Sequence, residues 1–501
     1  MWKAARKAVS LSESGVRRMI AKLSRMLSEK QISCVELTKA YLDAIEKEDG
    51  RLHAYITVTP ETALHTAQAV DARIAAGETL RPLEGIPMTL KDNLSTAGIE
   101  TTCASKMLQG YRPIYDATVW KLLREQNAVL LGKTNMDEFA MGSSCETSYF
   151  GGSVNPHNTN HVAGGSSGGV AAAVAGNLAA YGLGSDTGGS IRQPASFCGA
   201  VGLKPTYGAV SRYGLIAYAS SLDQIGPITT CVEDAALVFD AIAQYDPMDS
   251  TSQGKQSSAS PALQNDIRGM KIGVPNEYFE GLSDEVTASM NEAMRAYESM
   301  GAQIVRFPLA PLKYALPVYY ILACAEAASN LGRYDGIRYG YRAENYHTIH
   351  EMVCKTRSEG FGKEVQRRIL LGNYVLSSGY YEAYYRKAQN LRGAIVKGFD
   401  KAFAACDVIM APTVPMTAFP CGRTHSDPTE DYLTDICTVP INIAGLPAVS
   451  VPCGFDDKGL PIGMQLIGPR FHEAQVLNAA YAFERETGEK SFQAVKMGVQ
   501  L

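Results

Sequence analysis

The sequence lacks the cysteine and histidine patterns that hold metals or disulfides. Its eleven cysteines are widely spaced, odd in number and form no C-x-x-C pair. This pattern argues against a disulfide framework and favours reduced, mostly buried thiols in a cytosolic protein. Of the eight histidines, only His157 and His161 lie close together, and no carboxylate-rich stretch accompanies them. We therefore predict no metal site.

A strong excess of one charge and a long apolar run are also missing. The chain has 47 Lys and Arg against 51 Asp and Glu, a net charge of −4. This balance argues against nucleic-acid binding by the surface of this chain alone, so any nucleic acid would be held mainly by a partner. No apolar stretch approaches the roughly 20 residues of a membrane-spanning helix.

Acidic residues are scarce at the start of the chain. The first 25 residues hold seven Lys and Arg and one acidic residue, Glu13. Such a start is typical of an organelle transit peptide, but residues 10–13 (Ser-Leu-Ser-Glu) form a helix-capping pattern. The apolar spacing continues to Ile20 and Leu23, which favours a basic surface helix. We expect a cytoplasmic protein of bacterial type and leave organelle targeting and an upstream start site open.

The most distinctive stretch present is residues 162–192. Two Gly-Gly-Ser turns, in residues 164–169 and 186–190, bracket a run of small apolar residues that predicts a helix over 170–180. The second turn follows an apolar stretch of strand length around Leu183. Glycines around a serine allow unusual backbone conformations and leave N–H groups unshielded. A serine hydroxyl among such donors suits acyl transfer.

Two other interpretations of this stretch are weaker. Glycine- and serine-rich tracts are often flexible linkers, but this one lies inside apolar sequence. A phosphate-binding loop requires a Gly-Lys-Ser/Thr ending, which neither turn carries. The one such tripeptide, at residues 132–134, has Asn127 where the first glycine of the loop belongs.

Alternating helices and strands predict an α/β fold. Residues 1–80 look helical, with a capping box at Ser33–Glu36, and a buried strand over 85–90 ends at Lys91. A helix over 118–125 and a strand over 128–131 imply parallel connections. The next part of the pattern predicts turn-rich loops at 201–206 and 222–227, a helix over 232–244 and a surface loop over 246–269. After this loop, we expect a strand over 271–275 and several helices over 284–404. The end of the chain predicts strands over 407–412, 448–452 and 462–467, of which the last two form a hairpin, and a helix over 474–487.

Lys91 and the two glycine-serine turns match, in order, the amidase-signature family, which the sequence resembles over nearly its whole length. Residues 135–144, 204–208 and 220–227 extend the match. The resemblance implies one large catalytic domain over 81–501, with a mixed β-sheet flanked by helices. The helical region 1–80 would pack on that core.

The resemblance also implies the catalytic residues. Ser190 would be the acyl-forming nucleophile, Ser166 the bridging serine and Lys91 the base. The Gly165–Ser166 bond matches the position at which the family has a cis peptide. The oxyanion hole would be formed by the backbone N–H groups of Thr187, Gly188, Gly189 and Ser190.

These residue types make chemical sense together. Serine is a poor nucleophile until a base removes its proton, and no histidine lies in the matching motifs, so lysine must serve. An ordinary lysine has a pKa near 10.4, which only burial can lower to about 7. Taken alone, Lys91 would most simply be the point where an apolar strand reaches water. With the resemblance, the apolar run 86–90 is expected to carry Lys91 into a buried site.

Within the family, residues 365–372 and 432–436 resemble the glutamine-hydrolysing subunits of tRNA-dependent amidotransferases. Arg368 would bind the α-carboxylate of glutamine through two parallel hydrogen bonds, and Asp435 would bind its α-ammonium. Tyr319 and Ser143 would complete the substrate pocket. Without the resemblance, Arg368 would be interpreted as a solvated helix residue and Tyr319 as a core residue.

The same resemblance implies partners. The chain would act as the A component of a heterotrimer with B and C components, and ATP, Mg²⁺ and misacylated Glu-tRNA(Gln) would be bound mainly by the B component, with no cofactor in this chain. A free-standing amidase acting on small or fatty amides is the first alternative, and a catalytically silent scaffold protein is the second. The sequence leaves open whether Asp-tRNA(Asn) is also a substrate.

Overall fold

The computed structural model describes residues 19–254, 257–423, 432–492, 495 and 497–500. The predicted capping pattern at residues 10–13 lies outside this range. Within it, α1 begins at Met19 and buries Ile20 and Leu23, as their spacing predicted. The described helices are α1 Met19–Ser28, α2 Cys34–Leu52, α3 Pro60–Ala75, α4 Thr118–Glu125, α5 Gly168–Ala175, α6 Arg192–Cys198, α7 Val232–Ile242, α8 Asp284–Ser299, α9 Ala315–Asn330, α10 Ile349–Gly360, α11 Lys363–Leu376, α12 Lys387–Phe403, α14 Val439–Ala444 and α15 Glu473–Thr487.

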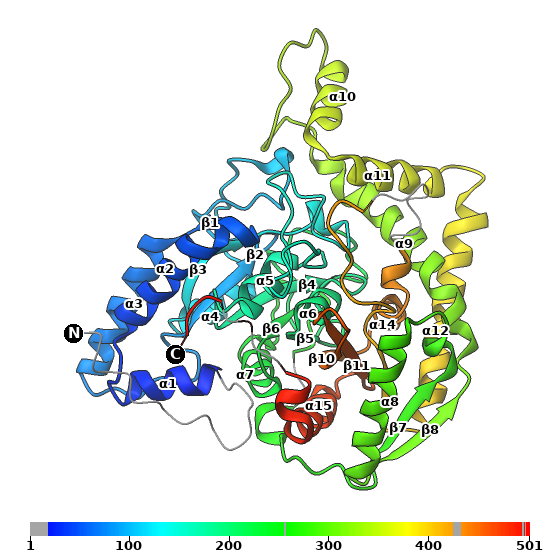
Figure 1. Cartoon of the computed structure of the whole chain (residues 1–501). Helices are drawn as coiled ribbons and strands as arrows, with labels where there is room; N and C mark the ends of the chain where they lie inside the picture. The colour runs from blue at the N-terminus through cyan, green and yellow to red at the C-terminus, as the bar shows by residue number, and fades with distance from the viewer. Residues whose placement is uncertain (1–18, 255–256, 424–431, 493–494, 496, 501) are drawn as a thin grey trace.

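One mixed sheet runs through the molecule and carries helices on its faces (Figure 1). The strand order is β1-β3-β2-β4-β6-β5-β10-β11-β9-β7-β8. The pairs within β3-β2-β4 and within β9-β7-β8 are parallel, the strands between them pair antiparallel, and the edge strand β1 pairs antiparallel with β3. The expected mixed sheet is thus confirmed. The strands are β1 Tyr55–Val58, β2 Pro87–Lys91, β3 Val129–Thr134, β4 Tyr181–Asp186, β5 Val201–Lys204, β6 Gln224–Thr229, β7 Lys271–Pro275, β8 Gln303–Phe307, β9 Val408–Pro412, β10 Ala448–Phe455 and β11 Pro461–Ile467.

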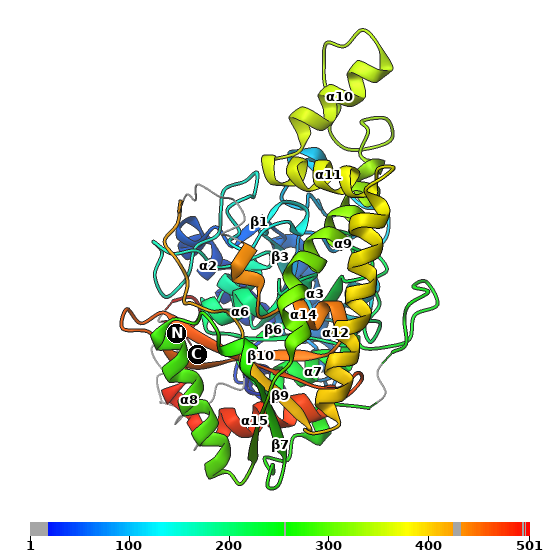
Figure 2. The same ribbon diagram turned by 90° about the vertical axis from the view of Figure 1, so that its right-hand side faces the viewer.

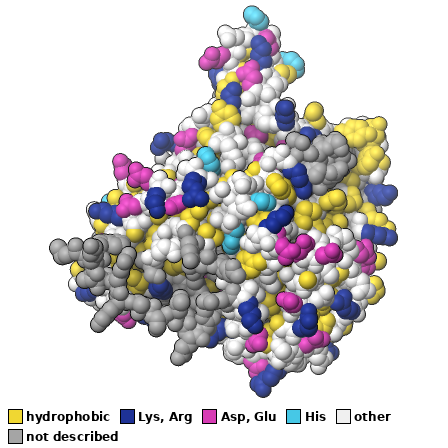
Figure 3. Space-filling model, in the orientation of Figure 1, with side chains coloured by type: hydrophobic (Ala, Val, Ile, Leu, Met, Phe, Trp, Pro, Cys, Tyr) yellow, Lys and Arg dark blue, Asp and Glu magenta, His cyan; other side chains and the backbone are white. Residues whose placement is uncertain are grey.

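Helices α5, α6, α7, α8 and α15 contact strands of the sheet, and two further groups of helices lie at its sides. The N-terminal group includes α2 and α3 beside the β1–β3 end of the sheet, and α2 begins at the predicted capping box, where Ser33 accepts the N–H of Glu36. The second group, α9, α11 and α12, packs together on the other side of the molecule, and α10 projects beyond it in both ribbon views (Figures 1 and 2). Exposed hydrophobic side chains gather where α11 leads to α12 (Figure 3): Leu370, Leu371, Tyr374, Tyr380, Tyr381 and Tyr384.

The prediction of turn-rich loops at 201–206 and 222–227 is wrong for most of both segments. Residues 201–204 form β5 and residues 224–227 belong to β6, in the middle of the sheet, whereas 205–206 and 222–223 are loop residues. A Cβ on Gly202 would lie 2.7 Å from the Cβ of Ala195 in α6, and one on Gly226 would lie 2.1 Å from the Leu203 carbonyl oxygen. The glycines that suggested turns are therefore required by close packing between strands and helix.

Other boundaries differ less. Helix α5 ends at Ala175, five residues before the predicted end, because Asn177 has a left-handed backbone (φ 55°). Strand β1 lies inside the region predicted to be helical, and β8 inside the region 284–404. Among the described residues, no helix combines the length and apolar character needed to cross a membrane.

Candidate active site

The centre of the site lies where β2 ends and α5 begins. Strand β2 is buried along its whole length between β3 and β4, and Lys91 is its last residue. The Lys91 Nζ lies 2.6 Å from the Ser166 Oγ. Ser166 stands two residues before α5, and the Gly165–Ser166 peptide bond is cis, at the position that the resemblance implied. Two of the three predicted catalytic side chains are thus in direct contact.

Burial changes the acid–base character of Lys91. Its side chain has no exposed surface, and this desolvation lowers the pKa of Lys91 to about 7, although the nearby carboxylates of Asp137, Asp186 and Asp223 act in the opposite direction. A lysine in water has a pKa near 10.4 and is almost fully charged at neutral pH. Lys91 therefore has a substantial neutral population that is able to accept a proton.

The turn that carries Ser190 is built around an ionised carboxylate. Strand β4 ends at Asp186, whose carboxylate oxygens accept the N–H groups of Gly189 (2.8 Å) and Ile191 (3.2 Å) and pair with the Arg192 Nε (3.0 Å). Burial alone would raise the pKa of Asp186, but Arg192 outweighs it and the pKa falls to about 2. The carboxylate thus holds residues 187–191 in one shape.

This turn lies against the segment of Ser166. The Ser167 N–H donates to the Ser190 carbonyl at 3.1 Å, so the two glycine-serine turns are side by side. Ser190 is 8% exposed. It is therefore largely enclosed, and a small part of its surface remains accessible.

The four predicted oxyanion donors divide into two kinds. The Gly189 N–H is committed to Asp186, which differs from the expectation for that residue. The N–H groups of Thr187, Gly188 and Ser190 have no hydrogen-bond partner among the described residues. A Cβ on Gly188 would lie 2.5 Å from the Tyr319 ring, so the backbone here approaches its neighbour as only glycine permits.

A second cluster surrounds Arg368, on α11. The Arg368 side chain is buried, its Nε donates to Glu364 Oε1 at 2.8 Å, and its Nη1 donates to the Tyr218 hydroxyl at 2.7 Å. Its guanidinium also lies 5.2 to 5.6 Å from the ring centres of Tyr218, Tyr320 and Tyr432. Glu364 and the Tyr218 hydroxyl bind part of the edge of this guanidinium, and the tyrosine rings lie around it. Its remaining N–H donors are available for a carboxylate.

Asp435 lies between this cluster and the nucleophile turn. It ends the short helix η8 (Leu433–Asp435), and its Oδ2 accepts the Tyr320 hydroxyl at 3.0 Å. Burial raises the pKa of Asp435 to about 7. Three residues later, the Thr438 Oγ1 donates to the carbonyl oxygens of Gly188 (2.6 Å) and Asp435 (3.1 Å). The two predicted head-group residues thus lie in one region that adjoins the catalytic turn.

The other two predicted substrate residues connect these parts. Tyr319 is buried, its ring packs on Gly188, and it contacts Tyr320 at a ring distance of 5.0 Å. Ser143 is partly buried, and its Oγ accepts the Thr434 hydroxyl at 3.1 Å. Its carbonyl accepts the Gln193 Nε2 at 3.0 Å, while the Gln193 Oε1 accepts the Gly165 N–H at 2.8 Å.

Sequence reasoning missed the residues that hold Arg368 in place. Glu364 lies four residues earlier on α11, a spacing that was a usable signal for a helical ion pair. Tyr218 and Tyr320 come from segments far away in the sequence, and no local pattern marks them. Tyr432 donates to the same Glu364 oxygen at 2.9 Å, which joins the segment of Asp435 to α11.

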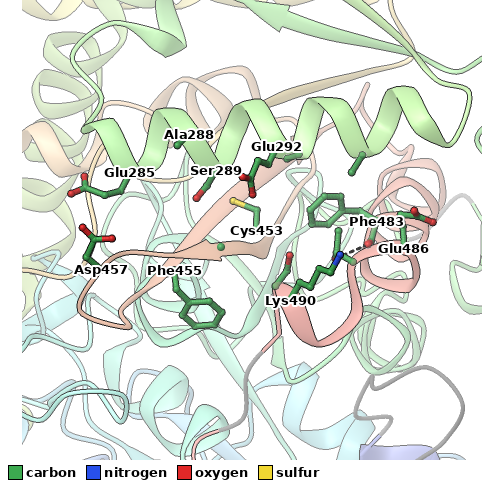
Figure 4. A pocket seen from close by; sticks show the side chains of 15 residues that line it. Glu285, Ala288, Ser289, Glu292, Cys453, Phe455, Asp457, Phe483, Glu486 and Lys490 are labelled. Atoms are coloured by element: carbon green, nitrogen blue, oxygen red, sulfur yellow. Dashed lines mark hydrogen bonds between the residues drawn. The ribbon is translucent and has the colours of Figure 1, made fainter.

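The structure does not support a phosphate-binding loop, and two other places were considered as sites. The Gly-Lys-Thr tripeptide at 132–134 lies in β3, where the Lys133 Nζ is buried against the Leu94 carbonyl (2.8 Å) and Asp92 (3.4 Å) instead of facing a loop. In the part of the chain that the structure describes, no group of His, Cys, Asp and Glu side chains is arranged to hold a metal ion. A cavity of about 610 Å³ between α8, β10 and α15 (Figure 4) includes Glu285, Glu292 and Lys490 but none of the predicted site residues.

Known proteins resemble this chain over most of its length. The Amidase family model matches residues 36–477. The A subunit of glutamyl-tRNA(Gln) amidotransferase from Moorella thermoacetica is 57% identical over 467 residues, which are 93% of this chain and 96% of that protein. The protein of the same name from Geobacter is 55% identical over 93% of this chain and 97% of its own length.

Solved structures show the same relationship. The crystal structure of the glutamyl-tRNA(Gln) amidotransferase A subunit from Thermotoga maritima has a TM-score of 0.78 and 39% identity, and covers 97% of this chain and 100% of that one. A bacterial aryl acylamidase of the amidase-signature family has a TM-score of 0.83 at 26% identity, over 96% of this chain and 99% of that one. The fold is thus shared by enzymes that act on different amides.

Proposed function

The chain belongs to the amidase family, and from that premise we propose that it is the glutamine-hydrolysing component, the A subunit, of a glutamyl-tRNA(Gln) amidotransferase. The observation that carries this proposal is that Arg368 and Asp435 both contact Tyr320, in the region beside the turn of Ser190. A guanidinium and a carboxylate in one region match the two charges of a free amino acid. Relatives more than 50% identical carry the name of that component.

Glutamine would bind with its head group away from the nucleophile. Its α-carboxylate would take the free donors of Arg368, and its α-ammonium would pair with Asp435. Tyr319, which packs on Gly188, would form the wall between the head group and the catalytic turn. This orientation places the side-chain amide, the only amide of the substrate, at Ser190.

In the proposed acylation step, Lys91, Ser166 and Ser190 act in sequence. Neutral Lys91 accepts the proton of Ser166 as Ser166 accepts the proton of Ser190, and Ser190 Oγ forms a bond to the amide carbon. The N–H groups of Thr187, Gly188 and Ser190 stabilise the negative oxygen of the tetrahedral intermediate. When the C–N bond breaks, the proton returns through Ser166 to the leaving nitrogen. The products are ammonia and a γ-glutamyl ester of Ser190.

Deacylation repeats the relay with water as the nucleophile. Lys91 and Ser166 remove a proton from the water, the ester C–O bond breaks, and Ser190 regains its proton. The net reaction converts glutamine and water to glutamate and ammonia. The ammonia would pass to the B subunit, which activates Glu-tRNA(Gln) with ATP and Mg²⁺, in an assembly that also contains a C subunit. The net charge of −4 agrees with tRNA being bound mainly by that partner.

Ammonia release tests this proposal. L-glutamine would be compared with a simple carboxamide such as propionamide, using the chain alone and with its B and C partners, for the wild type and for Ser190→Ala. We expect glutamine-dependent release that Ser190→Ala abolishes. Rapid turnover of propionamide without turnover of glutamine would instead identify a free-standing amidase, an activity type that the shared aryl acylamidase fold also supports.

A further inference from the structure

Lys91 has contacts that the proton relay does not use. Its Nζ lies 3.0 Å from the Ser185 Oγ and 3.3 Å from the Ser185 carbonyl oxygen. Ser185 belongs to β4, which pairs with β2 in parallel, so the two residues meet across neighbouring strands. The Ser185 side chain is buried. Three oxygen atoms therefore surround the amine: Ser166 Oγ and the two oxygens of Ser185.

Asn93 holds the Ser185 hydroxyl from the other side. It lies two residues after Lys91, is buried, and donates from its Nδ2 to the Ser185 Oγ at 2.9 Å. An amide nitrogen is only a donor, so one acceptor position of the Ser185 oxygen is filled by Asn93. The second acceptor position remains for an N–H of Lys91.

We propose that Ser185, held by Asn93, is a positioning residue that turns the lone pair of neutral Lys91 toward Ser166. A neutral amine has two N–H bonds and one lone pair. The Ser185 carbonyl takes one N–H, the Ser185 hydroxyl takes the other, and the lone pair faces the proton of Ser166. After the proton moves from Ser166 to Lys91, the three N–H bonds of the ammonium meet the same three oxygens. The site thus passes between both protonation states without a rearrangement of its nitrogen and oxygen atoms.

This inference rests on the proposed function only in taking Lys91 as the base. The ionisable groups that act on Lys91 are the carboxylates of Asp137, Asp186 and Asp223 and the thiol of Cys145. All four remain in the variants that test the inference. A change in the pH profile is therefore attributable to Ser185 or Asn93.

The test measures kcat and KM for glutamine from about pH 5.5 to 9, with the full chain and its partners. Ser185→Ala should lower kcat about ten- to a hundredfold with KM within about twofold, because a misdirected base loses part of its contribution. Ser185→Thr keeps the hydroxyl and should restore kcat to within about threefold. Asn93→Asp adds a negative charge behind Ser185, so it should shift the acid limb of kcat upward by about one pH unit.

Ser450→Ala is the matched control, because Ser450 is a buried serine of β10 in the same sheet, hydrogen-bonded to the Thr413 hydroxyl at 2.8 Å. It should leave kcat unchanged. Wild-type kcat and pH profile in both Ser185→Ala and Asn93→Asp would overturn the inference. If the Ser185→Ala variant does not fold well enough to be assayed, the kcat values and pH profiles of Ser185→Thr and Asn93→Asp test the inference instead. If the wild type hydrolyses propionamide but not glutamine, the proposed function fails, and the same variants test the inference on propionamide.

Discussion

The catalytic centre and the head-group cluster are built in opposite ways. The centre uses β2, the start of α5 and the turn after β4, where side chains of the main core such as Leu90, Leu183 and Ile191 are buried. The head-group cluster uses α9, α11 and η8, and its Tyr218, Tyr319 and Tyr320 belong to a separate hydrophobic cluster. In the proposed function, the first region would supply backbone donors and proton transfer, and the second would supply charge and aromatic surface.

This division implies that chemistry and substrate choice are separable. Changes at the centre should affect all amides alike, whereas changes around Arg368 should affect only substrates with an amino-acid head group. Tyr319 against Gly188 and Thr438 on the Gly188 carbonyl are direct contacts between the regions. The expected effects below run from the largest to the smallest.

Gly188→Ala should damage every reaction. The added Cβ would collide with Tyr319 and displace an oxyanion donor, a loss that typically lowers kcat about a hundred- to a thousandfold. Steady-state kinetics with glutamine and propionamide should show similar losses. Gly393→Ala, in α12 where a Cβ meets no atom within 4 Å, is the control. A loss confined to glutamine would contradict the assignment of Gly188 to the common centre.

Arg368→Lys should separate the two regions. Lysine keeps the charge, but with Glu364 and Tyr218 bound its ammonium has a single donor left and cannot make two parallel hydrogen bonds to a carboxylate. The kcat/KM for glutamine should therefore fall about a hundredfold, mainly through KM. Turnover of propionamide should change less than about threefold. Arg386→Lys, at an exposed ion pair with Glu382 outside the cluster, should leave the turnover of both substrates unaffected. Equal losses for the two amides would show that Arg368 serves the centre instead.

The pH dependence should differ between kcat and KM. Lys91, with a pKa of about 7, must be neutral to act, so kcat should rise with pH through about 7. Asp435, with a pKa of about 7, is protonated below that pH and then cannot pair with an ammonium, so KM for glutamine should rise up to about tenfold per pH unit below 7.

Two measurements check this separation. KM for propionamide, which has no ammonium group, should not follow the titration of Asp435. Asp435→Asn should raise KM for glutamine and remove its dependence on pH while the kcat profile stays in place. A kcat profile that changes with Asp435→Asn would contradict the separation of the two regions.

Glu364→Gln should have the smallest effect. The amide oxygen still accepts from Arg368 and Tyr432, but the negative charge that holds the guanidinium edge is lost. We expect KM for glutamine to rise about three- to tenfold with kcat unchanged. Glu382→Gln, which removes an exposed ion pair with Arg386 outside the cluster, is the matched control. An unchanged KM would mean that the tyrosines alone orient Arg368.

The centre was the easier region to predict. Lys91, Ser166 and Ser190 stand in short motifs that carry the family resemblance, and only with that resemblance did the apolar run before Lys91 indicate burial. The commitment of the Gly189 N–H to Asp186 was not predictable, because it depends on how the turn closes on a carboxylate three residues away. The same holds for β5 and β6, whose glycines look like turn residues until α6 packs on them.

Arg368 and Asp435 were identified through resemblance and not through any local pattern. Each alone is a charged residue on a helix. The environment of Arg368 is formed by Tyr218, Tyr320 and Tyr432, which lie in three segments far from Arg368 in the sequence and bury its guanidinium. Sequence periodicity reports which face of a helix is apolar but not which distant side chain that face will meet.

The sequence by itself determined the fold class, the order of the catalytic motifs and the residue types of the relay, because these depend on neighbours within a few positions. Only the tertiary structure decided which N–H groups are free, how far the pKa values of Lys91 and Asp435 move, and what holds Arg368 and Lys91 in place. Those properties depend on desolvation and on distances between segments far apart in the chain, and both arise only when the sheet and its helices close around the site.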